Sequence, residues 1–145
     1  MPATAGVPYP QGPGTHDPNS ERPAMTDFEG LVPAMANALT KRGYTTLTPV
    51  QQAVIDPALA DADALVSAQT GSGKTVAFGL AIAPTLLGGT DRFERAAAPL
   101  ALVIAPTREL ALQVKRELEW LYELTGATIA SCVGGMDMRN ERRSL

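Results

Sequence analysis

Residues 64–75 read ALVSAQTGSGKT, and this stretch decides the fold. Its first five residues form a short apolar run of the kind found in buried strands. A glycine-rich turn follows, with Gly71 and Gly73 two positions apart, and residues 75–87 then have the pattern of a helix. A strand that passes through such a turn into a helix is the setting of a phosphate-binding loop. The stretch therefore predicts a phosphate site at the start of the helix.

The side chains of this loop suit phosphate chemistry. Gly71 and Gly73 let the backbone turn tightly and direct its N–H groups inward, where the helix dipole adds positive charge. Lys74 can reach the β and γ phosphates of a nucleotide, and the hydroxyl of Thr75 is suited to bind Mg²⁺. Ala68 stands where the general pattern has a glycine. The alternative is an ordinary glycine-rich turn beside an exposed lysine.

Two further apolar segments, 100–105 and 127–133, have the composition of strands. The segment 100–105 does not alternate with polar residues, which suits a strand covered on both faces. Helical patterns follow the first two predicted strands, at 75–87 and again from Leu110 to Leu124, where apolar residues recur every three or four positions. Alternating strands and helices predict an α/β fold with parallel βαβ units. Three strands are few for so apolar a sheet, so we expect the domain to be incomplete at its C-terminal end.

The N-terminal region divides in two. Residues 1–25 hold six prolines and three glycines, which predicts a disordered tail. Residues 26–145 form the partial domain, and apolar residues at helical spacing predict a helix from Leu31 to Leu39. A second helical segment follows, interrupted near Pro57.

Composition excludes several kinds of chemistry. The chain has one histidine, His16 in the predicted tail, and one cysteine, Cys132, which we assign to the core. It therefore lacks the residues for a Ser-His-Asp or Cys-His catalytic set, a thiolate metal site or an internal disulfide, and this cysteine usage suits the cytoplasm. No apolar run is long enough to span a membrane. The net charge of −3 argues mildly against nonspecific binding of polyanions.

Residues 43–51, GYTTLTPVQ, lie shortly before the phosphate loop. The amide of Gln51 offers one acceptor and two donors, which match the N6 amine and N7 of adenine, and Tyr44 could stack on a base. A solvated glutamine after a helix end is the more common meaning of such a stretch. Trp120 and Tyr122, in the last predicted helix, are expected to pack and not to stack on bases.

Together these residues resemble the N-terminal core domain of the DEAD-box RNA helicases over residues 27–145. Residues 43–51 are similar to the adenine-reading Q motif of that family, and Phe28 to its separate upstream aromatic residue. Residues 68–75 match motif I, in which alanine is the ordinary first residue. Residues 106–111 match motif Ia, and Gly134 with Gly135 resembles the GG element. Leu47 departs from the proline that is common there, which alters the stiffness of the loop and leaves Gln51 usable.

The resemblance implies a P-loop NTPase (RecA-like) parallel sheet with helices on both faces, and it implies two sets of site residues. Lys74 and Thr75 would act in catalysis, with Thr75 holding Mg²⁺. The ATP-binding set is Phe28, Tyr44, Gln51, Ala68, Gln69, Thr70, Gly71, Ser72, Gly73, Lys74 and Thr75. The set that contacts the RNA backbone is Pro106, Thr107, Arg108, Glu109, Gly134 and Gly135.

The RNA set also has simpler explanations. Arg108 could form a surface ion pair with Glu109 or Glu117, and the two glycines could form an ordinary turn after a strand. The other basic residues of this region suit a solvated helix face equally well: Lys115, Arg116, Arg139, Arg142 and Arg143.

The function implied by the resemblance is ATP-dependent unwinding of RNA by a monomer in the cytoplasm. No Asp-Glu-Ala-Asp sequence occurs in the chain. We therefore expect an N-terminal fragment that binds ATP but cannot hydrolyse it alone, and that exposes its apolar strands. The alternatives are a non-catalytic module that binds nucleotide or RNA, and a DNA helicase or another P-loop ATPase.

Overall fold

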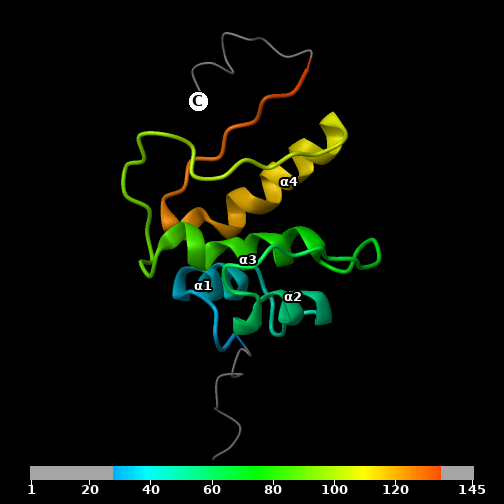
Figure 1. The fold of residues 1–145 in the computed structure, drawn as a ribbon, viewed down its shortest axis with the longest axis vertical. Helices are drawn as coiled ribbons and strands as arrows, with labels where there is room; N and C mark the ends of the chain where they lie inside the picture. The colour runs from blue at the N-terminus through cyan, green and yellow to red at the C-terminus, as the bar shows by residue number, and fades with distance from the viewer. Residues whose placement is uncertain (1–27, 135–145) are drawn as a thin grey trace, which may run out of the picture.

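The computed structural model of the chain describes residues 28–134, in which helices pack around a small core (Figure 1). The α-helices of this range are α1 (Pro33–Lys41), α2 (Pro49–Val54), α3 (Lys74–Leu87) and α4 (Arg108–Leu121), and its 3₁₀ helices are η1 (Pro57–Leu59) and η2 (Glu123–Thr125). α3 packs against both α2 and α4, and α1 packs against α4 and η2. The chain thus forms a helical body with α3 between the first and last parts of the sequence.

The predicted helix from Leu31 to Leu39 is present as α1 with shifted ends, and the second helical segment begins with α2. Pro33 is the first residue of α1, where its missing N–H costs no hydrogen bond, and Gly43 follows the helix with φ of 87°. The side-chain hydroxyl of Thr48 caps α2 by accepting a hydrogen bond from the N–H of Gln51. The side chain of Gln51 in turn accepts a hydrogen bond from the N–H of Thr48. The expected interruption at Pro57 is confirmed, because α2 ends before this residue and η1 begins at it.

α3 and α4 make their closest contact at Gly79. A Cβ atom added there would lie 2.5 Å from Cδ2 of Leu121 and 3.0 Å from Cδ2 of Leu118, so the two helices approach as far as a glycine permits. The hydroxyl of Tyr122 donates to the carbonyl oxygen of Gly79 over 2.7 Å. The main core cluster holds apolar side chains from α1, α3, α4 and the turns: Phe28, Ala34, Met35, Leu39, Leu47, Val76, Leu80, Ala83, Leu87, Leu118, Leu121 and Tyr122.

The amphipathic pattern expected in the last helix is confirmed, but its buried face is short. Leu118 and Leu121 are buried, whereas Leu110 at the start of α4 is exposed. Leu124, the last residue of the pattern, lies in η2 and is exposed as well. α4 is therefore anchored by its C-terminal half.

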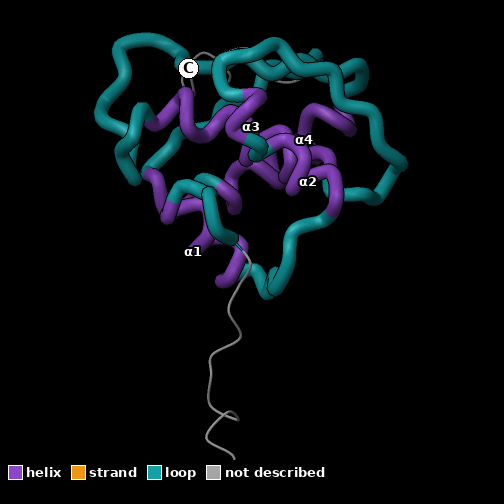
Figure 2. The backbone as a smooth tube through the Cα atoms, turned by 60° about the horizontal axis from the view of Figure 1, so that its bottom comes forward, coloured by secondary structure: helices purple, strands orange, loops and turns teal. Residues whose placement is uncertain are grey.

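The three predicted strands are absent from the described range 28–134, which contains only helices and loops (Figure 2). Leu102 and Ile104 are each 85% exposed, so the cover expected on both faces of segment 100–105 is absent from this structure. Leu65, in the first apolar segment, is 102% exposed. A strand requires a hydrogen-bonded neighbour, and its apolar side chains require a surface to pack on. The segments have strand composition, but the described residues 28–134 form no sheet. The expected exposure of these apolar residues is confirmed.

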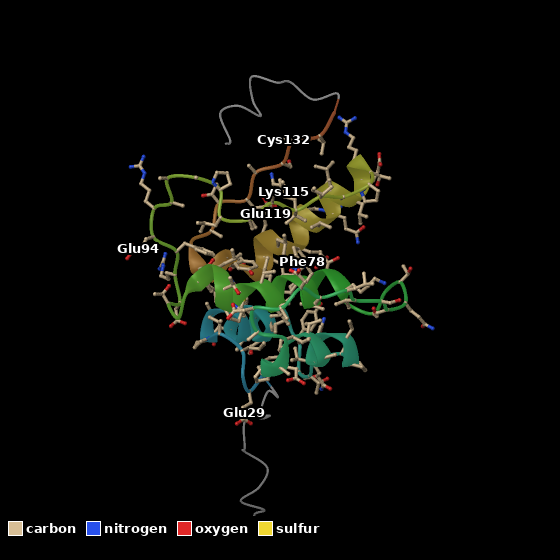
Figure 3. All side chains as sticks on the ribbon, in the orientation of Figure 1. Glu29, Phe78, Glu94, Lys115, Glu119 and Cys132 are labelled. Atoms are coloured by element: carbon tan, nitrogen blue, oxygen red, sulfur yellow. The ribbon has the colours of Figure 1, made fainter. Side chains whose placement is uncertain are left out.

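Cys132 also differs from its expected place. It was expected in the core, but it is exposed on the extended segment after η2 (Figure 3). The reason is that the described residues form no sheet that could cover this side chain. The predicted tail at 1–25 lies outside the described residues, as does Gly135.

Candidate nucleotide and nucleic-acid site

The loop between residue 68 and α3 has the backbone expected of a phosphate cradle. Gly71 and Gly73 adopt φ of 80° and 86°, values in the left-handed region that favours glycine. Gly73 is the N-cap residue of α3, and no side chain caps this helix. The first N–H groups of a helix have no partner within the helix. The start of α3 is therefore an open set of donors at the positive end of a 14-residue helix.

Lys74 closes over this loop. Its Nζ donates to the carbonyl oxygens of Ala68 and Gln69, the second over 2.9 Å, and the side chain is exposed. Thr75 follows as the second residue of α3 and is partly buried. An ammonium that bonds two neutral carbonyls can exchange them for charged phosphate oxygens, which form stronger bonds. The lysine thus holds the loop shape and remains accessible to a phosphate.

Ser72 contributes an unpaired polar atom. Its N–H donates to the carbonyl of Gln69 over 3.2 Å, while its Oγ is buried and has no hydrogen-bond partner. A buried hydroxyl without a partner costs free energy, which a phosphate oxygen or a bound water would recover. This observation, together with the open start of α3, fits a phosphate-bearing ligand.

Two side chains at the start of α2 form hydrogen bonds to the backbone of the phosphate loop. The hydroxyl of Thr48 donates to the carbonyl of Ser72 over 2.9 Å, and Nε2 of Gln51 donates to the carbonyl of Gly73 over 3.3 Å. Oε1 of Gln51 accepts from the N–H of Thr48 over 3.0 Å, and Gln51 is fully buried. A Cβ atom on Gly73 would lie 2.5 Å from Nε2 of Gln51. Residues 43–51, which we call the Gln51 stretch, and the phosphate loop at 68–75 were predicted separately, and hydrogen bonds join them directly.

Thr48 was not predicted as a site residue. Its role in fixing Ser72 depends on two segments 24 residues apart meeting in space, which residue spacing does not reveal. The usable signal was local, since a threonine three residues before a glutamine is a capping-box pattern. That pattern predicts the start of a helix, but it does not predict the second hydrogen bond of Thr48, to the carbonyl of Ser72.

The two aromatic residues predicted to contact adenine have other neighbours in this structure. Phe28 is buried in the core cluster with Met35 and Leu39. Tyr44 stacks on Trp120, with ring centroids 5.8 Å apart and an interplanar angle of 24°. A base contact by Phe28, Tyr44 or Gln51 stays a prediction.

The residues predicted to contact RNA are exposed at the start of α4. Thr107 is the N-cap residue, and its hydroxyl accepts from the N–H of Leu110 over 3.2 Å. Arg108, the first residue of the helix, makes no ion pair among residues 28–134, so neither predicted glutamate pairs with it. Pro106 and Glu109 are exposed, as is Gly134 at the end of the described range. Contact with RNA stays a prediction.

Metal and membrane sites find little support in the described residues. Within 28–134, no three His, Cys, Asp or Glu side chains gather where they could hold a metal ion. Mg²⁺ commonly takes most of its ligands from water and nucleotide phosphates, so one hydroxyl such as that of Thr75 fits its needs. None of the helices in this range has the length and apolarity to cross a bilayer.

Comparison with known proteins identifies the family. The family model described as DEAD/DEAH box helicase matches residues 48–145. The chain belongs to the DEAD/DEAH box helicases. This match begins at Thr48, the residue that joins α2 to the phosphate loop.

Individual helicases cover more of the chain. The ATP-dependent rRNA helicase RRP3 of Meyerozyma guilliermondii is 42% identical over 132 residues, which is 90% of this chain and 26% of the relative. The ATP-dependent RNA helicase RhlB of Pseudomonas aeruginosa is 37% identical over 130 residues, covering 89% of this chain and 32% of the relative. This helicase chain thus spans about a quarter to a third of the length of these relatives.

A solved structure supports the fold class. The RNA helicase Prp28 of Chaetomium thermophilum, bound to ADP, superposes with a TM-score of 0.66 at 36% sequence identity. The match covers 78% of this chain and 27% of the Prp28 chain. The helicase chain therefore has the P-loop (RecA-like) fold in outline, although its described residues form no sheet.

Proposed function

We propose that the chain is the ATP-binding part of an ATP-dependent RNA helicase, in which RNA-stimulated ATP hydrolysis drives local unwinding of RNA duplexes. The observation that carries the proposal is the phosphate loop, which opens at the uncapped start of α3 and is fastened from behind by Thr48 and Gln51. The names of the relatives, which are RNA and rRNA helicases, favour RNA over DNA as the nucleic acid.

The loop residues have distinct roles in this proposal. Lys74 leaves the carbonyls of Ala68 and Gln69 and pairs with the β and γ phosphates. The hydroxyl of Ser72 gains a phosphate oxygen as partner. Thr75 and the phosphates together would hold Mg²⁺, which supplies charge neutralisation when it is bound. The backbone of Gln69, Thr70, Gly71 and Gly73 completes the cradle.

Adenine recognition falls to the Gln51 stretch. One N–H of Nε2 and one lone pair of Oε1 remain after the bonds to Gly73 and Thr48, and this pair matches the N7 and N6 positions of adenine. Because Gln51 is fully buried, its neighbours must move aside to admit the base. Phe28 and Tyr44 would then supply aromatic surface beside it.

The RNA-contacting surface in this proposal is the start of α4 with the glycine pair. Thr107 and Arg108 are exposed there, and a guanidinium without an ion pair among the described residues is suited to a backbone phosphate. Pro106, Glu109, Gly134 and Gly135 would complete the contact with the RNA backbone. The proposal takes the protein to be a cytoplasmic monomer.

The test is Lys74→Ala in the full-length protein, with Lys115→Ala as control. Lys115 pairs with Glu119 over 3.5 Å on the surface of α4, so its loss removes the same charge without touching the loop. We expect Lys74→Ala to abolish RNA-stimulated ATP hydrolysis and the control to retain it. Undiminished turnover by Lys74→Ala refutes the assignment, and equal stimulation by RNA and DNA favours another class of P-loop ATPase. We also expect the isolated chain to bind ATP without turnover, because its sequence contains no Asp-Glu-Ala-Asp motif whose carboxylates would orient the attacking water.

A further inference from the structure

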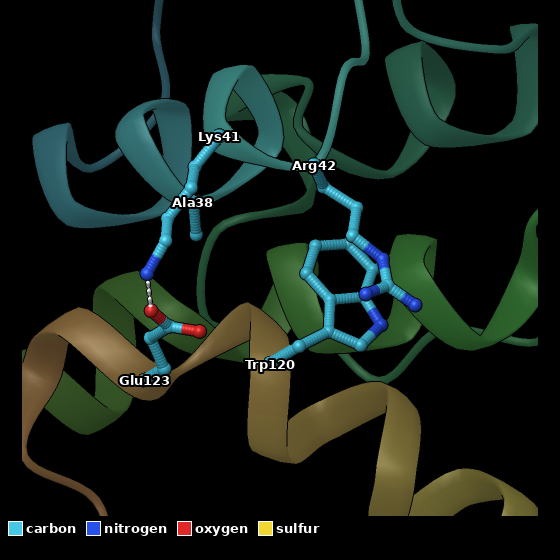
Figure 4. A pocket seen from close by; sticks show the side chains of 5 residues that line it. All are labelled: Ala38, Lys41, Arg42, Trp120 and Glu123. Carbon is cyan, nitrogen blue, oxygen red and sulfur yellow. Dashed lines mark hydrogen bonds and ion pairs between the residues drawn. The ribbon is translucent and has the colours of Figure 1, made fainter.

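A group of aromatic and charged side chains joins the end of α1 to the end of α4 (Figure 4). We call it the α1–α4 junction. Three contacts define it: Tyr44 stacks on Trp120, the Arg42 guanidinium lies 5.3 Å from the centroid of the Trp120 ring, and Lys41 pairs with Glu123. Nε1 of Trp120 donates to Glu117 over 2.9 Å, which fixes the indole on its own helix.

The junction lies at the edge of the core and is not the only anchor of α4. Lys41 and Glu123 are exposed, whereas Tyr44 and Trp120 are partly buried and pack against the core. Exposed ion pairs and cation–π contacts contribute little to folding. The burial of Leu118 and Leu121 against Gly79 already anchors the helix. The two aromatic rings therefore add to the packing at the edge of the core, and they also place the end of α1 in direct contact with the end of α4.

The position of the junction indicates a second role beside packing. Tyr44 lies four residues before Thr48, whose hydroxyl bonds the carbonyl of Ser72 in the phosphate loop. Trp120 lies one residue before the end of α4, the helix that begins at the exposed residues Thr107 and Arg108. A 14-residue helix moves as a rigid body, so a shift at Trp120 is transmitted to its start. The junction is a direct contact between the segment behind the nucleotide loop and the helix that presents the RNA residues.

We propose that Trp120 is a positioning residue that couples nucleotide binding at the phosphate loop to the orientation of α4. Entry of a base beside Gln51 must displace the buried Gln51 stretch, which moves Tyr44 and Arg42 against the indole. The new position of Trp120 turns α4 about its anchor at Gly79 and changes how Arg108 is presented. This inference rests on the proposed function.

Coupling is measured as the ratio of RNA affinities of the full-length protein with and without a non-hydrolysable ATP analogue. We expect Trp120→Leu, which keeps an apolar side chain but loses the stack, to reduce this ratio roughly threefold to tenfold. Trp120→Phe, which retains a ring for Tyr44 and Arg42, should restore most of it. Affinity for ATP in the absence of RNA should change little. An unchanged ratio in Trp120→Leu, or an equal loss in Trp120→Phe, overturns the proposal.

Fluorescence gives a readout that a packing role would not move. Trp120 is the single tryptophan of the chain, so its emission reports the junction directly. We expect ATP to change this emission and Lys74→Ala to abolish the change. If displacement of a fluorescent ATP analogue proves binding while Trp120 emission stays constant, the coupling is wrong and the proposed function stands. If the analogue does not bind, the proposed function fails and the coupling fails with it.

Discussion

The starts of α3 and α4 form a natural comparison, because the two helices have the same length and both follow apolar segments. α3 begins at Gly73, which has φ of 86° and no side chain to cap the helix. α4 begins at Thr107, which has extended backbone and accepts from the N–H of Leu110. The first helix leaves its amides open, whereas the second satisfies one of its own.

This difference separates two kinds of anion site. An uncapped start with left-handed glycines is ready for a phosphate without rearrangement. A start capped by threonine already has a hydrogen-bond acceptor, so an RNA phosphate there must rely on the exposed Arg108 and on the amides that remain. The nucleotide site is thus built into the backbone, and the predicted RNA site depends more on side chains.

The largest effect should come from a side chain at the start of α3. Gly73→Ala places a Cβ 2.5 Å from Nε2 of Gln51 and forces a left-handed backbone, so we expect ATP affinity to fall by roughly a hundredfold, about 2.7 kcal/mol. Gly88→Ala is the matched control, since Gly88 also has positive φ but no atom within 4 Å. Both variants should lose about 1 to 2 kcal/mol of stability, and only the first should lose ATP binding in calorimetric titration. Equal ATP affinities for the two variants contradict the comparison.

Thr48→Val tests whether the open start depends on support from α2. The substitution keeps the shape but removes the hydroxyl that donates to Ser72 and accepts from Gln51. We expect ATP to bind about fivefold to tenfold more weakly, the value of one hydrogen bond. Thr48→Ser should retain normal affinity in the same titration. Normal affinity for Thr48→Val means that the loop holds its shape alone.

Sequence reasoning succeeded where the signal was local. Helical spacing predicted α1, Pro57 predicted the interruption after α2, and the glycine spacing predicted the turn before α3. All of these act within a few residues of themselves, so the pattern contains the cause.

It failed where the outcome depends on distant partners. The composition of the apolar segments around Leu65 and Leu102 predicts that they should be buried. Whether they are buried depends on other segments that could pack against them. The same dependence exposes Cys132 and hid the bond from Thr48 to the phosphate loop. The stack of Tyr44 on Trp120 was also missed, because it depends on the fold bringing α1 and α4 together. The predicted contact of Tyr44 with a base stays a prediction.

A smaller effect is expected at the start of α4. Thr107→Ala removes the hydroxyl that caps α4 by accepting from the N–H of Leu110. We expect the free energy of unfolding, measured by urea titration, to fall by about 1 kcal/mol. ATP affinity should stay normal, in contrast to Gly73→Ala. Thr107→Ser keeps the hydroxyl and should keep the stability. A loss of ATP affinity in Thr107→Ala means that the two helix starts are not independent.

The smallest effect on stability at neutral pH should come from the hydrogen bond between Tyr122 and Gly79, which joins the end of α4 to the middle of α3. Tyr122→Phe removes the bond to Gly79 and should cost about 0.5 to 1 kcal/mol, with ATP affinity unchanged. Burial raises the pKa of Tyr122 well above its usual range. The folded state therefore holds this proton more tightly than the unfolded chain, whose tyrosine ionises near about pH 10. Stability from this group is complete below about pH 10 and is lost as the pH rises further. Urea titrations between pH 8 and 11 should show this loss in the wild type and a flatter profile in Tyr122→Phe, and parallel profiles would show that the phenol is not the source.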